Sequence, residues 1–429
     1  MKNFFIIFTL FSVSSLFAEN ATSTIQGGDT AWVLVSTALV MIMTPGLAFF
    51  YGGMVKKKHV LSVLMHCFAI LALVSIQWVL LGYSLSFSKG NGFIGSLEWF
   101  GLKNIGLESG PYSDTIPHLV FVMFQAMFAI ITPALMVGAF VERMKFLFLI
   151  LFSLLWATLI YDPIAHWVWA KDGWLAAKGA LDFAGGTVVH INAGFGAFVV
   201  ALLIGKRKNS TFGPTPHNIA YTLLGTAILW FGWFGFNAGS ALGANGLAAN
   251  AFMVTNTSAS AAALSWIFIE WLMTGKPTTL GMATGAVAGL VAITPASGFV
   301  DVTGSILIGI VVSPLCYFMI TTIKSKFKYD DALDVFGVHG IGGIVGALLT
   351  GVFANPSINE LGKGVIYGNL EQLWIQFLSV LVVAVYSAVG TLVIYLVLSL
   401  FVKARVDEKE EAIGLDLSEH NERAYTLIE

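Results

Sequence analysis

Two histidines within long apolar stretches are the residues of this sequence best suited to chemistry. His190 ends the run ALDFAGGTVVH, and His339 ends the similar run ALDVFGVH. Both runs begin with Ala-Leu-Asp, which places Asp182 and Asp334 near the starts of the two segments. An imidazole can donate, accept and relay a proton near neutral pH, so a matched pair of histidines predicts a path that handles protons.

Both histidines lie in apolar surroundings that are unusual for an ionisable side chain. An ionisable side chain inside a membrane span costs roughly 2.5–3.5 kcal/mol or more, so it normally faces a pathway or a partner. A lone histidine in such a place is more often a packing residue that is hydrogen-bonded to a neighbouring helix. The repetition of the motif favours a functional interpretation, because transporters built from internal repeats bring equivalent residues together at a shared pathway.

Composition indicates the class of protein that must position these residues. Of the 429 residues, 57% are hydrophobic and 11% are charged, whereas globular chains carry about 25% charged residues. The sequence therefore predicts an all-α polytopic membrane protein. Eleven apolar windows are long enough to span a bilayer, and they cover residues 30–52, 59–84, 117–141, 145–162, 185–205, 217–238, 249–273, 278–297, 302–323, 335–354 and 371–402.

The N-terminal residues 1–18 are typical of a secretory signal peptide. They combine Lys2, a short apolar run and Ala18 before Glu19. An uncleaved extra span is the alternative. With the signal peptide removed, the mature N-terminus is expected outside the membrane.

Positive charges between the windows indicate the orientation. If the chain starts outside, fourteen Lys and Arg residues fall at the inner junctions and five fall in the outer loops. The five outer ones are Lys89, Lys103, Lys171, Lys178 and Lys363. Because cytoplasmic loops carry an excess of Lys and Arg, this distribution predicts an N-out/C-in orientation.

The spans divide into two halves with an odd number each. Spans one to five cover 30–205 and spans six to ten cover 217–354, so the second half must be inverted relative to the first. The long span eleven, 371–402, is left over. Residues 403–429 follow as a cytoplasmic tail, which is either a solvated end or a regulatory docking segment.

Aromatic residues near the outer ends of the spans predict a cation site. Phe124 and Phe128 lie one helical turn apart, and Ser240 offers a hydroxyl acceptor. Most aromatic residues at this level are interfacial belt residues, but a ring that faces a pathway attracts a small cation by about 2 kcal/mol when desolvated. Such a mouth above an apolar path with two imidazoles suggests that a protonated molecule is captured, loses its proton and crosses as a neutral species.

Several long motifs resemble one family. They are MTPGLAFFYGG at residues 43–53, LDFAGGTVVHIN at 181–192, GWFGFNAGS at 232–240 and DVFGVHG at 334–340. Together they resemble the Amt/Mep/Rh ammonium transporters, on the bacterial Amt side. The resemblance extends from span one to the tail. The run WAKDG at 169–173 departs from the pattern, because related transporters often have a shorter glycine-rich run there.

The resemblance implies a role for each of ten residues. His190 and His339 look like the twin histidines of the pore, and Phe128 and Phe236 like the phenyl gate above them. Ammonium recruitment is implied for Phe124, Trp169 and Ser240. Asp182 looks like the aspartate that acts in deprotonation or as a structural helix cap, and Trp233 and Thr294 are the remaining pore-lining candidates.

The resemblance also implies a homotrimer with one pore per subunit and a PII-type signalling protein as partner of the tail. The tail motif is Gly414-Leu415-Asp416. The expected function is ammonium transport, with net charge movement favoured over a passive ammonia channel. The alternatives are an ammonium sensor that signals through its tail and a metalloenzyme. Two histidines without a third ligand make a poor metal site, so neither an enzyme nor a cofactor is expected.

Overall fold

The structure is a computed structural model that describes residues 24–208 and 216–425. The predicted signal peptide and the last four residues of the tail lie outside the described residues. Within the described ranges, ten helical segments are long and apolar enough to cross a membrane. They are Gly27–Met54, Lys57–Phe87, His118–Phe140, Phe146–Ala177, Gly186–Ile204, Ile219–Ala241, Gly246–Thr274, Val302–Phe327, Phe336–Phe353 and Leu370–Ser399. The predicted all-helical, multi-pass architecture is confirmed.

The predicted window 278–297 contains the shorter helix α12, Thr279–Ile293. Each of the other windows coincides with one of the ten segments. The count of eleven spans, the inverted repeat and the orientation in the membrane stay predictions.

Four segments consist of one main helix. These are α5 (His118–Phe140), α10 (Ile219–Ala238), α11 (Gly246–Thr274) and α16 (Leu370–Ser399). The first segment is divided at Ile42 into α1 (Gly27–Met41) and α2 (Met43–Met54). Short 3-10 helices lie at the segment ends or between segments, namely η1 (Lys57–His59), η3 (Phe100–Leu102), η7 (Gly239–Ala241) and η10 (Val365–Tyr367).

Five segments contain a π-helical turn. The second consists of α3 (Val60–Gln77), η2 (Trp78–Gly82) and α4 (Tyr83–Phe87). The fourth consists of α6 (Phe146–Trp156), η4 (Ala157–Tyr161), α7 (Asp162–Trp169) and the short α8 (Trp174–Ala177). The others are η5 (Gly186–Ile191) before α9 (Asn192–Ile204), η8 (Met319–Ile323) between α13 (Val302–Phe318) and α14 (Lys324–Phe327), and η9 (Phe336–Gly340) before α15 (Ile341–Phe353).

The fourth segment is longer than the window 145–162 predicted from the sequence. Its helix continues to Trp169, so this side chain lies on the helix rather than in a loop after it. Pro163 lies in the first turn of α7, directly after the π-helical turn η4, and the buried Asp162 accepts a hydrogen bond from Gln77 Nε2 at 2.8 Å.

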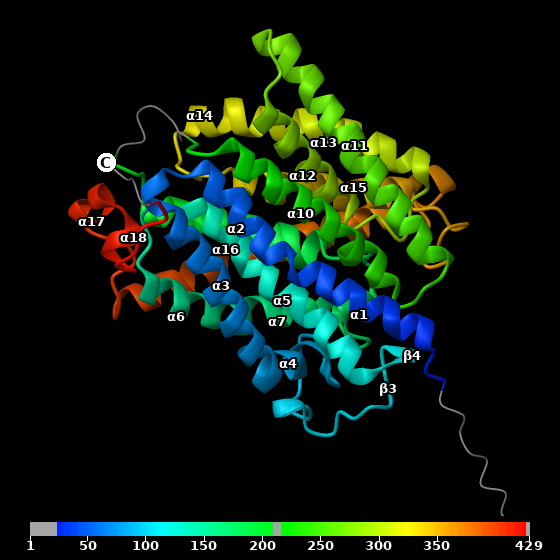
Figure 1. Ribbon diagram of the computed structural model, residues 1–429. Helices are drawn as coiled ribbons and strands as arrows, with labels where there is room; N and C mark the ends of the chain where they lie inside the picture. Colours follow the sequence, from blue (N-terminus) through cyan, green and yellow to red (C-terminus); the bar gives the residue numbers. More distant parts are fainter. Residues whose placement is uncertain (1–23, 209–215, 426–429) are drawn as a thin grey trace, which may run out of the picture.

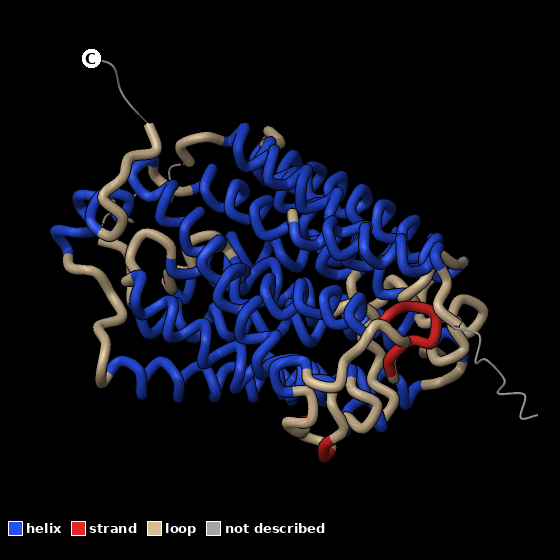
Figure 2. The backbone as a smooth tube through the Cα atoms, turned by 60° about the horizontal axis from the view of Figure 1, so that its bottom comes forward, coloured by secondary structure: helices blue, strands red, loops and turns tan. Residues whose placement is uncertain are grey.

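Figure 1 shows the helices as one bundle with different structures at its two ends. The described chain starts at one end, and the tail helices α17 (Glu408–Ile413) and α18 (Leu415–Ser418) lie at the other. Figure 2 shows that the strands and many of the loops gather at the starting end. We call these the flap end and the tail end.

The flap, residues 88–117, contains two small antiparallel sheets. In the first, β1 (Gly90–Asn91) pairs with β2 (Ile94–Gly95), with Gly90 opposite Gly95. In the second, β3 (Ser109–Gly110) pairs irregularly with β4 (Ser113–Pro117), with Ser109 opposite Pro117. Trp167 Nε1 donates to Phe93 O at 2.7 Å, so the flap is fixed to α7.

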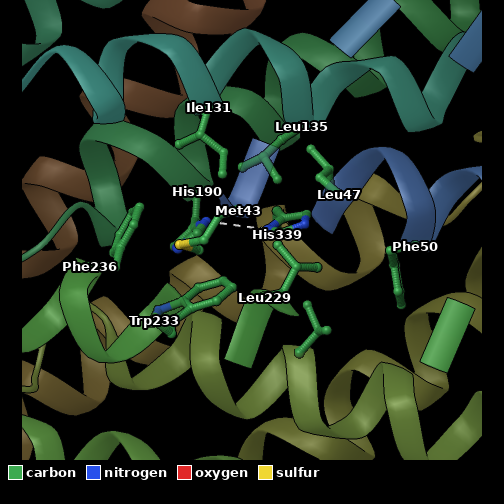
Figure 3. A pocket seen from close by; sticks show the side chains of 11 residues that line it. Met43, Leu47, Phe50, Ile131, Leu135, His190, Leu229, Trp233, Phe236 and His339 are labelled. Atoms are coloured by element: carbon green, nitrogen blue, oxygen red, sulfur yellow. Dashed lines mark hydrogen bonds between the residues drawn. The ribbon is translucent and has the colours of Figure 1, made fainter. Parts of the chain in front are cut away.

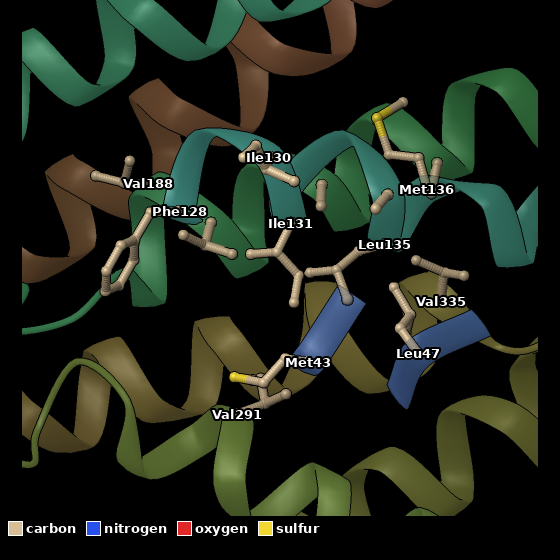
Figure 4. Close-up of a cluster of buried hydrophobic side chains, with 14 of the residues drawn as sticks. Met43, Leu47, Phe128, Ile130, Ile131, Leu135, Met136, Val188, Val291 and Val335 are labelled. Carbon is tan, nitrogen blue, oxygen red and sulfur yellow. The ribbon is translucent and has the colours of Figure 1, made fainter. Parts of the chain in front are cut away.

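The core of the bundle is apolar. Figure 4 shows side chains of α2 and α5 meeting at its centre, among them Met43, Leu47, Ile131 and Leu135. Small residues let other helices approach closely. A Cβ on Gly194 of α9 would lie 2.4 Å from Gly340 Cα, so the helices that carry the two histidines cross at a pair of glycines.

Candidate functional site: an aromatic mouth and a buried histidine pair

His190 and His339 lie side by side in the middle of the bundle. Their Nδ1 atoms are 3.3 Å apart, and their rings are stacked with centroids 5.2 Å apart. Both side chains are buried, with exposed fractions of 1% and 4%. Figure 3 shows the pair between Phe236 on one side and Phe50 on the other. The structure therefore brings together two residues that are 149 positions apart.

Each histidine lies on a π-helical turn, His190 in η5 and His339 in η9. A π turn shifts the direction of the side chains relative to a regular α-helix, and such turns are frequent at functional sites. Together with the close approach of Gly194 and Gly340, the two turns direct both imidazoles towards the same point.

Asp182 is the cap of the first histidine helix. Its carboxylate accepts hydrogen bonds from the backbone N–H groups of Gly185, Gly186, Thr187 and Val188, at 2.5–3.1 Å. A carboxylate at a helix start satisfies N–H groups that have no partner within the helix. Asp182 does not line the cavities described below. Its contacts are those of a structural helix cap, one of the two roles expected for it.

The second histidine helix is capped by Asp331, and the sequence comparison that matched Asp334 with Asp182 was wrong. Asp331 accepts from the backbone N–H groups of Val335 and Phe336, at 3.1 and 2.8 Å. Asp334 instead forms an ion pair with Lys324 at 2.5 Å. The wrong match rested on the tripeptide Ala-Leu-Asp, which occurs at both 180–182 and 332–334. The spacing of eight residues from aspartate to histidine, 182 to 190 and 331 to 339, would have identified the equivalent residues.

A first cavity, the mouth cavity, opens at the flap end. It is lined by Phe87, Tyr112, Phe121, Gln125, Phe128, Trp169, Phe183, Ser240 and Leu242. Trp169 and Ser240 were predicted at such a site. Trp169 is held by a hydrogen bond from its Nε1 to Asp182 O at 2.8 Å. Phe124 lies behind this wall, with its ring edge-on to Phe128 at 5.0 Å.

Gln125 was not identified from the sequence. Its Oε1 is buried and has no hydrogen-bond partner in the part of the chain that the structure describes, and its side chain lines the mouth cavity. A single polar residue between Phe124 and Ala126 in an otherwise apolar run was the available signal. An unpaired buried acceptor is costly, so a ligand with an N–H group would find a partner here.

Two phenylalanines separate the mouth cavity from the histidines. The rings of Phe128 and Phe236 are 4.4 Å apart, at an angle of 40°. Phe128 faces the mouth cavity and Phe236 lines the next one. Phe236 also stacks on His190, with centroids 6.0 Å apart. The two rings thus lie between the mouth cavity and the next cavity.

The second cavity, the histidine cavity, has an almost purely apolar lining. Its residues are Met43, Leu47, Phe50, Ile131, Leu135, His190, Leu229, Trp233, Phe236, Val287 and His339. The indole N–H of Trp233 is turned away, because it donates to Thr294 Oγ1 at 2.9 Å. Thr294 therefore orients Trp233 and does not itself line the cavity. His190 Nε2 is buried and has no hydrogen-bond partner among the described residues.

A third cavity continues towards the tail end. It shares Phe50, Val287 and His339 with the histidine cavity and adds Asp334, among others. The three cavities thus form a row from the flap to the tail end. Among the residues that the structure describes, no group of three His, Cys, Asp or Glu side chains is placed to hold a metal ion.

The tail motif Gly414-Leu415-Asp416 is docked against the start of α3. Ser62 N donates to Asp416 Oδ1 at 2.8 Å, and Leu415 N to His59 Nδ1 at 3.2 Å. Gly414 has φ = 111°, and a Cβ there would lie 2.6 Å from Lys58 O. The motif is thus part of the folded structure.

Comparison with known proteins decides the family. The model of the Ammonium Transporter Family matches residues 31–425. The chain belongs to the ammonium transporter family. An ammonium transporter of Bacillus subtilis is 53% identical over 401 residues, which cover 93% of this chain and 99% of that protein. One of Aquifex aeolicus is 52% identical over 422 residues, covering 97% and 98%.

Solved structures agree with this family assignment. The crystal structure of Candida albicans Mep2 matches with a TM-score of 0.85 and 37% identity, covering 90% of this chain and 88% of Mep2. A structure titled Sensor Amt Protein matches with a TM-score of 0.85 and 29% identity, covering 92% and 98%. The resemblance to the ammonium transporter family seen in the sequence is confirmed. The relatives of this chain are transporters rather than enzymes.

Proposed function

We propose that this protein transports ammonium into the cell. Ammonium is captured in the mouth cavity, loses its proton near Phe128 and Phe236, and crosses the histidine cavity as ammonia towards the cytoplasm. One observation carries the proposal. An aromatic mouth leads into an apolar cavity whose ionisable side chains are the two imidazoles.

The lining of the histidine cavity supports a neutral permeant. A bare cation would need a ring of carbonyl or carboxylate oxygens to replace its water, and an isolated charge in an apolar environment is very costly. Ammonia is neutral and needs only a few hydrogen bonds. The free Nε2 of His190 offers one of them.

The contact between the imidazoles supports a path for the proton. In a neutral pair with the Nδ1 atoms 3.3 Å apart, one Nδ1 donates and the other accepts. Such a pair can pass a proton from one ring to the other. We therefore favour transport with net charge movement. The alternative is a passive ammonia channel, in which the proton stays outside.

The cellular setting follows the family resemblance. We propose a homotrimer in the cell inner membrane, with the mature N-terminus outside and the tail in the cytoplasm. The tail end carries many cations, including Lys58, Lys145, Lys208 and Arg405, which contact the acidic tail. This distribution of charge supports the orientation. We also propose that a PII-type protein binds at the docked motif 414–416.

A sensor is the second candidate. It is favoured by the likeness to the Sensor Amt Protein, and its output would pass through the tail. Removing residues 403–429 would then abolish a signalling response while leaving ammonium flux intact. If no signalling response depends on the tail, the sensor role is excluded.

Proteoliposomes test the proposed function directly. An ammonium pulse is applied to vesicles that hold the purified chain and an internal pH dye, while the current is recorded on a solid support. A pH change with a current indicates charge-coupled transport, and a pH change without current indicates a passive ammonia channel. If protein-containing and empty vesicles respond alike in both signals, the chain does not transport ammonium.

A further inference from the structure

Gln376 lies fully buried on α16, and its side-chain amide connects the chain just before the first histidine helix to the second histidine helix. Its Oε1 accepts from Leu181 N at 2.7 Å, and its Nε2 donates to Leu181 O at 2.8 Å. The same Nε2 also donates to Ala347 O of α15 at 3.1 Å. One side chain thus binds the backbone next to His190 and the backbone of the helix that follows His339.

The orientation of this amide is fixed by its partners. Gln372 Nε2, one turn earlier on α16, donates to Gln376 Oε1 at 3.4 Å, so both lone pairs of the oxygen and both N–H groups are used. Turning the amide over would place its N–H groups against Leu181 N–H and its oxygen against two carbonyl groups. Because unpaired buried polar groups are costly, Gln376 holds Leu181 and Ala347 in one arrangement.

α16 lies outside both predicted repeats but packs against a helix of each, α9 and α15. Ser387 Oγ of α16 donates at 2.7 Å to the backbone oxygen of Asn192, the residue directly after η5. α15 also approaches η5 closely, since a Cβ on Gly343 would lie 3.0 Å from Gly186 O. This position allows α16 to fix one histidine helix relative to the other.

Leu181 transmits the contact with Gln376 to His190. The next residue, Asp182, accepts from Trp169 Nε1 through its backbone oxygen and caps η5 through its carboxylate. A displacement of Leu181 therefore shifts this cap and the turn that carries His190. The histidine contact tolerates little movement. Its Nδ1 atoms are already 3.3 Å apart, and at about 3.6 Å a hydrogen bond is lost.

We propose that Gln376 is a positioning residue of the transport path, which holds His190 and His339 at the separation that their Nδ1 contact requires. Gln376 lines none of the three cavities and acts through the backbone of Leu181 and Ala347. Its role in transport rests on the proposed function, whereas its effect on the histidine pair does not.

The histidine pair is observed directly by nitrogen NMR of isotope-labelled imidazole rings, on the full chain in vesicles. The Nδ1 signal of His190 is assigned by its loss in His190→Ala, and His339→Ala gives the position of this signal without the partner ring. Gln376→Met keeps a long side chain but has no amide, and we expect it to shift the signal towards the His339→Ala position. A signal that stays at the native position would overturn the proposal.

Thr391→Val is the matched control. Thr391 is also fully buried on α16, and its Oγ1 accepts at 2.9 Å from Trp156 Nε1 of α6, a helix that carries neither histidine. Both substitutions leave a buried N–H group without its partner. We expect a similar fall in melting temperature for both variants, but a shifted His190 signal only in Gln376→Met. Equal shifts would show that general loosening of α16 is the cause, which contradicts the proposal.

Transport is then measured in proteoliposomes under an ammonium pulse. Per folded molecule, we expect the current of Gln376→Met to be about tenfold or more below that of Thr391→Val, because a small misplacement caused by a distant substitution can cost that much. If the native chain gives a pH response without current, the pH responses are compared instead. Equal transport by both variants would overturn the role of Gln376 in transport.

A second substitution keeps the proposal testable if Gln376→Met does not fold. Gln376→Asn retains the amide but is one methylene shorter, so it cannot reach Leu181 and Ala347 together. It takes the place of Gln376→Met in both measurements, with the same control and the same expected results.

The outcomes separate this proposal from the proposed function. Native ammonium transport, with an unchanged His190 signal and unchanged transport in the Gln376 variant, would overturn the proposal and leave the function standing. A native chain without ammonium flux, in which the Gln376 substitution still shifts the His190 signal, would contradict the function and support the positioning of the histidine pair.

Discussion

His190 and His339 contact each other through like atoms, with 3.3 Å between Nδ1 and Nδ1. A neutral imidazole carries its proton on one nitrogen and accepts at the other. One ring of a neutral pair must therefore carry its proton on Nδ1 and the other on Nε2. A proton that moves along the pair changes both tautomers together. This coupling is the basis of the proposed relay.

Replacing Gly194 by alanine tests how the histidines are held together. The added Cβ would lie 2.4 Å from Gly340 Cα and N, so the two helices must separate. Overpacking of this kind costs about 1–3 kcal/mol, and we expect a lower melting temperature in detergent and a reduced ammonium flux. The control is Gly246→Ala at the start of α11, where the new Cβ would meet no described atom within 4 Å beyond its chain neighbours and its own helix backbone. If Gly194→Ala behaves like this control, the proposed tight crossing is wrong.

Asp331 and Asp334 are predicted to contribute differently to the free energy of unfolding. Asp331→Ala removes the acceptor of two buried backbone N–H groups at the start of η9, which should lower the free energy of unfolding by about 1–2 kcal/mol. Asp334→Ala breaks a partly exposed ion pair with Lys324 and should cost less than about 1 kcal/mol. Thermal unfolding of both variants measures this difference. A larger loss for Asp334→Ala would restore the pairing suggested by the sequence.

The stability of the tail end should depend on pH through the ionisation of Asp331. Burial raises the pKa of Asp331 to about 6, although Lys324 opposes the shift, whereas an unfolded aspartate has a pKa of about 3.9. Because the folded state holds this proton more tightly, stability contributed by Asp331 is present below pH 4 and is lost as the pH rises to about 6. Burial alone would raise the pKa of the neighbouring Asp330, but Arg207 and Arg143 lower it to about 2. Asp330 therefore affects stability only below this pH range.

Asp331→Asn isolates this effect. The melting temperature is followed from pH 4 to pH 7 for the native chain and for the variant. We expect a steeper decline between pH 4 and 6 in the native chain, with a difference on the order of 2 kcal/mol. The same slope in both proteins would show that other groups cause it.

The docked tail should be released by Glu411→Ala. Glu411 is 8% exposed, and its carboxylate accepts from Lys208 N and from Arg405, both at 2.7 Å. We expect cleavage by trypsin after Lys409 to become about tenfold faster or more, because proteolysis follows the population of the open form. Glu408→Ala serves as the control, since its pair with Lys208 is exposed and such pairs contribute little. Unchanged cleavage of Glu411→Ala would mean that other contacts hold the tail.

The sequence predicted the helical architecture well because apolar length is a strong signal in membrane proteins. It also singled out His190 and His339, since a histidine in an apolar run is conspicuous. The π-helical turns that carry them were not predicted. A hydrophobic stretch of this length has the same sequence pattern whether or not one of its turns contains an extra residue. Only the packing around Gly194 and Gly340 shows why the turns matter.

Residues that act through the folding of loops were harder to predict. Tyr112 reaches the mouth cavity because the flap folds back onto α5, and short irregular strands give little signal in a sequence. The role of Asp331 was missed because a shared tripeptide drew attention to Asp334 instead of the distance to the histidine. Phe124 lies next to Phe128, as expected from their spacing of one turn, but this spacing does not indicate which of the two rings lines the cavity.

Ammonium transport past the histidine pair is expected to move charge across the membrane. The most direct measurement is the current evoked by an ammonium pulse across proteoliposomes, for the native chain and for His190→Ala combined with His339→Ala. We predict a native current that is lost or sharply altered in the double variant, while its melting temperature shows that it is folded. A native pH response without any current would show that no charge moves, and a current that the double variant retains unchanged would show that the charge does not pass the histidines.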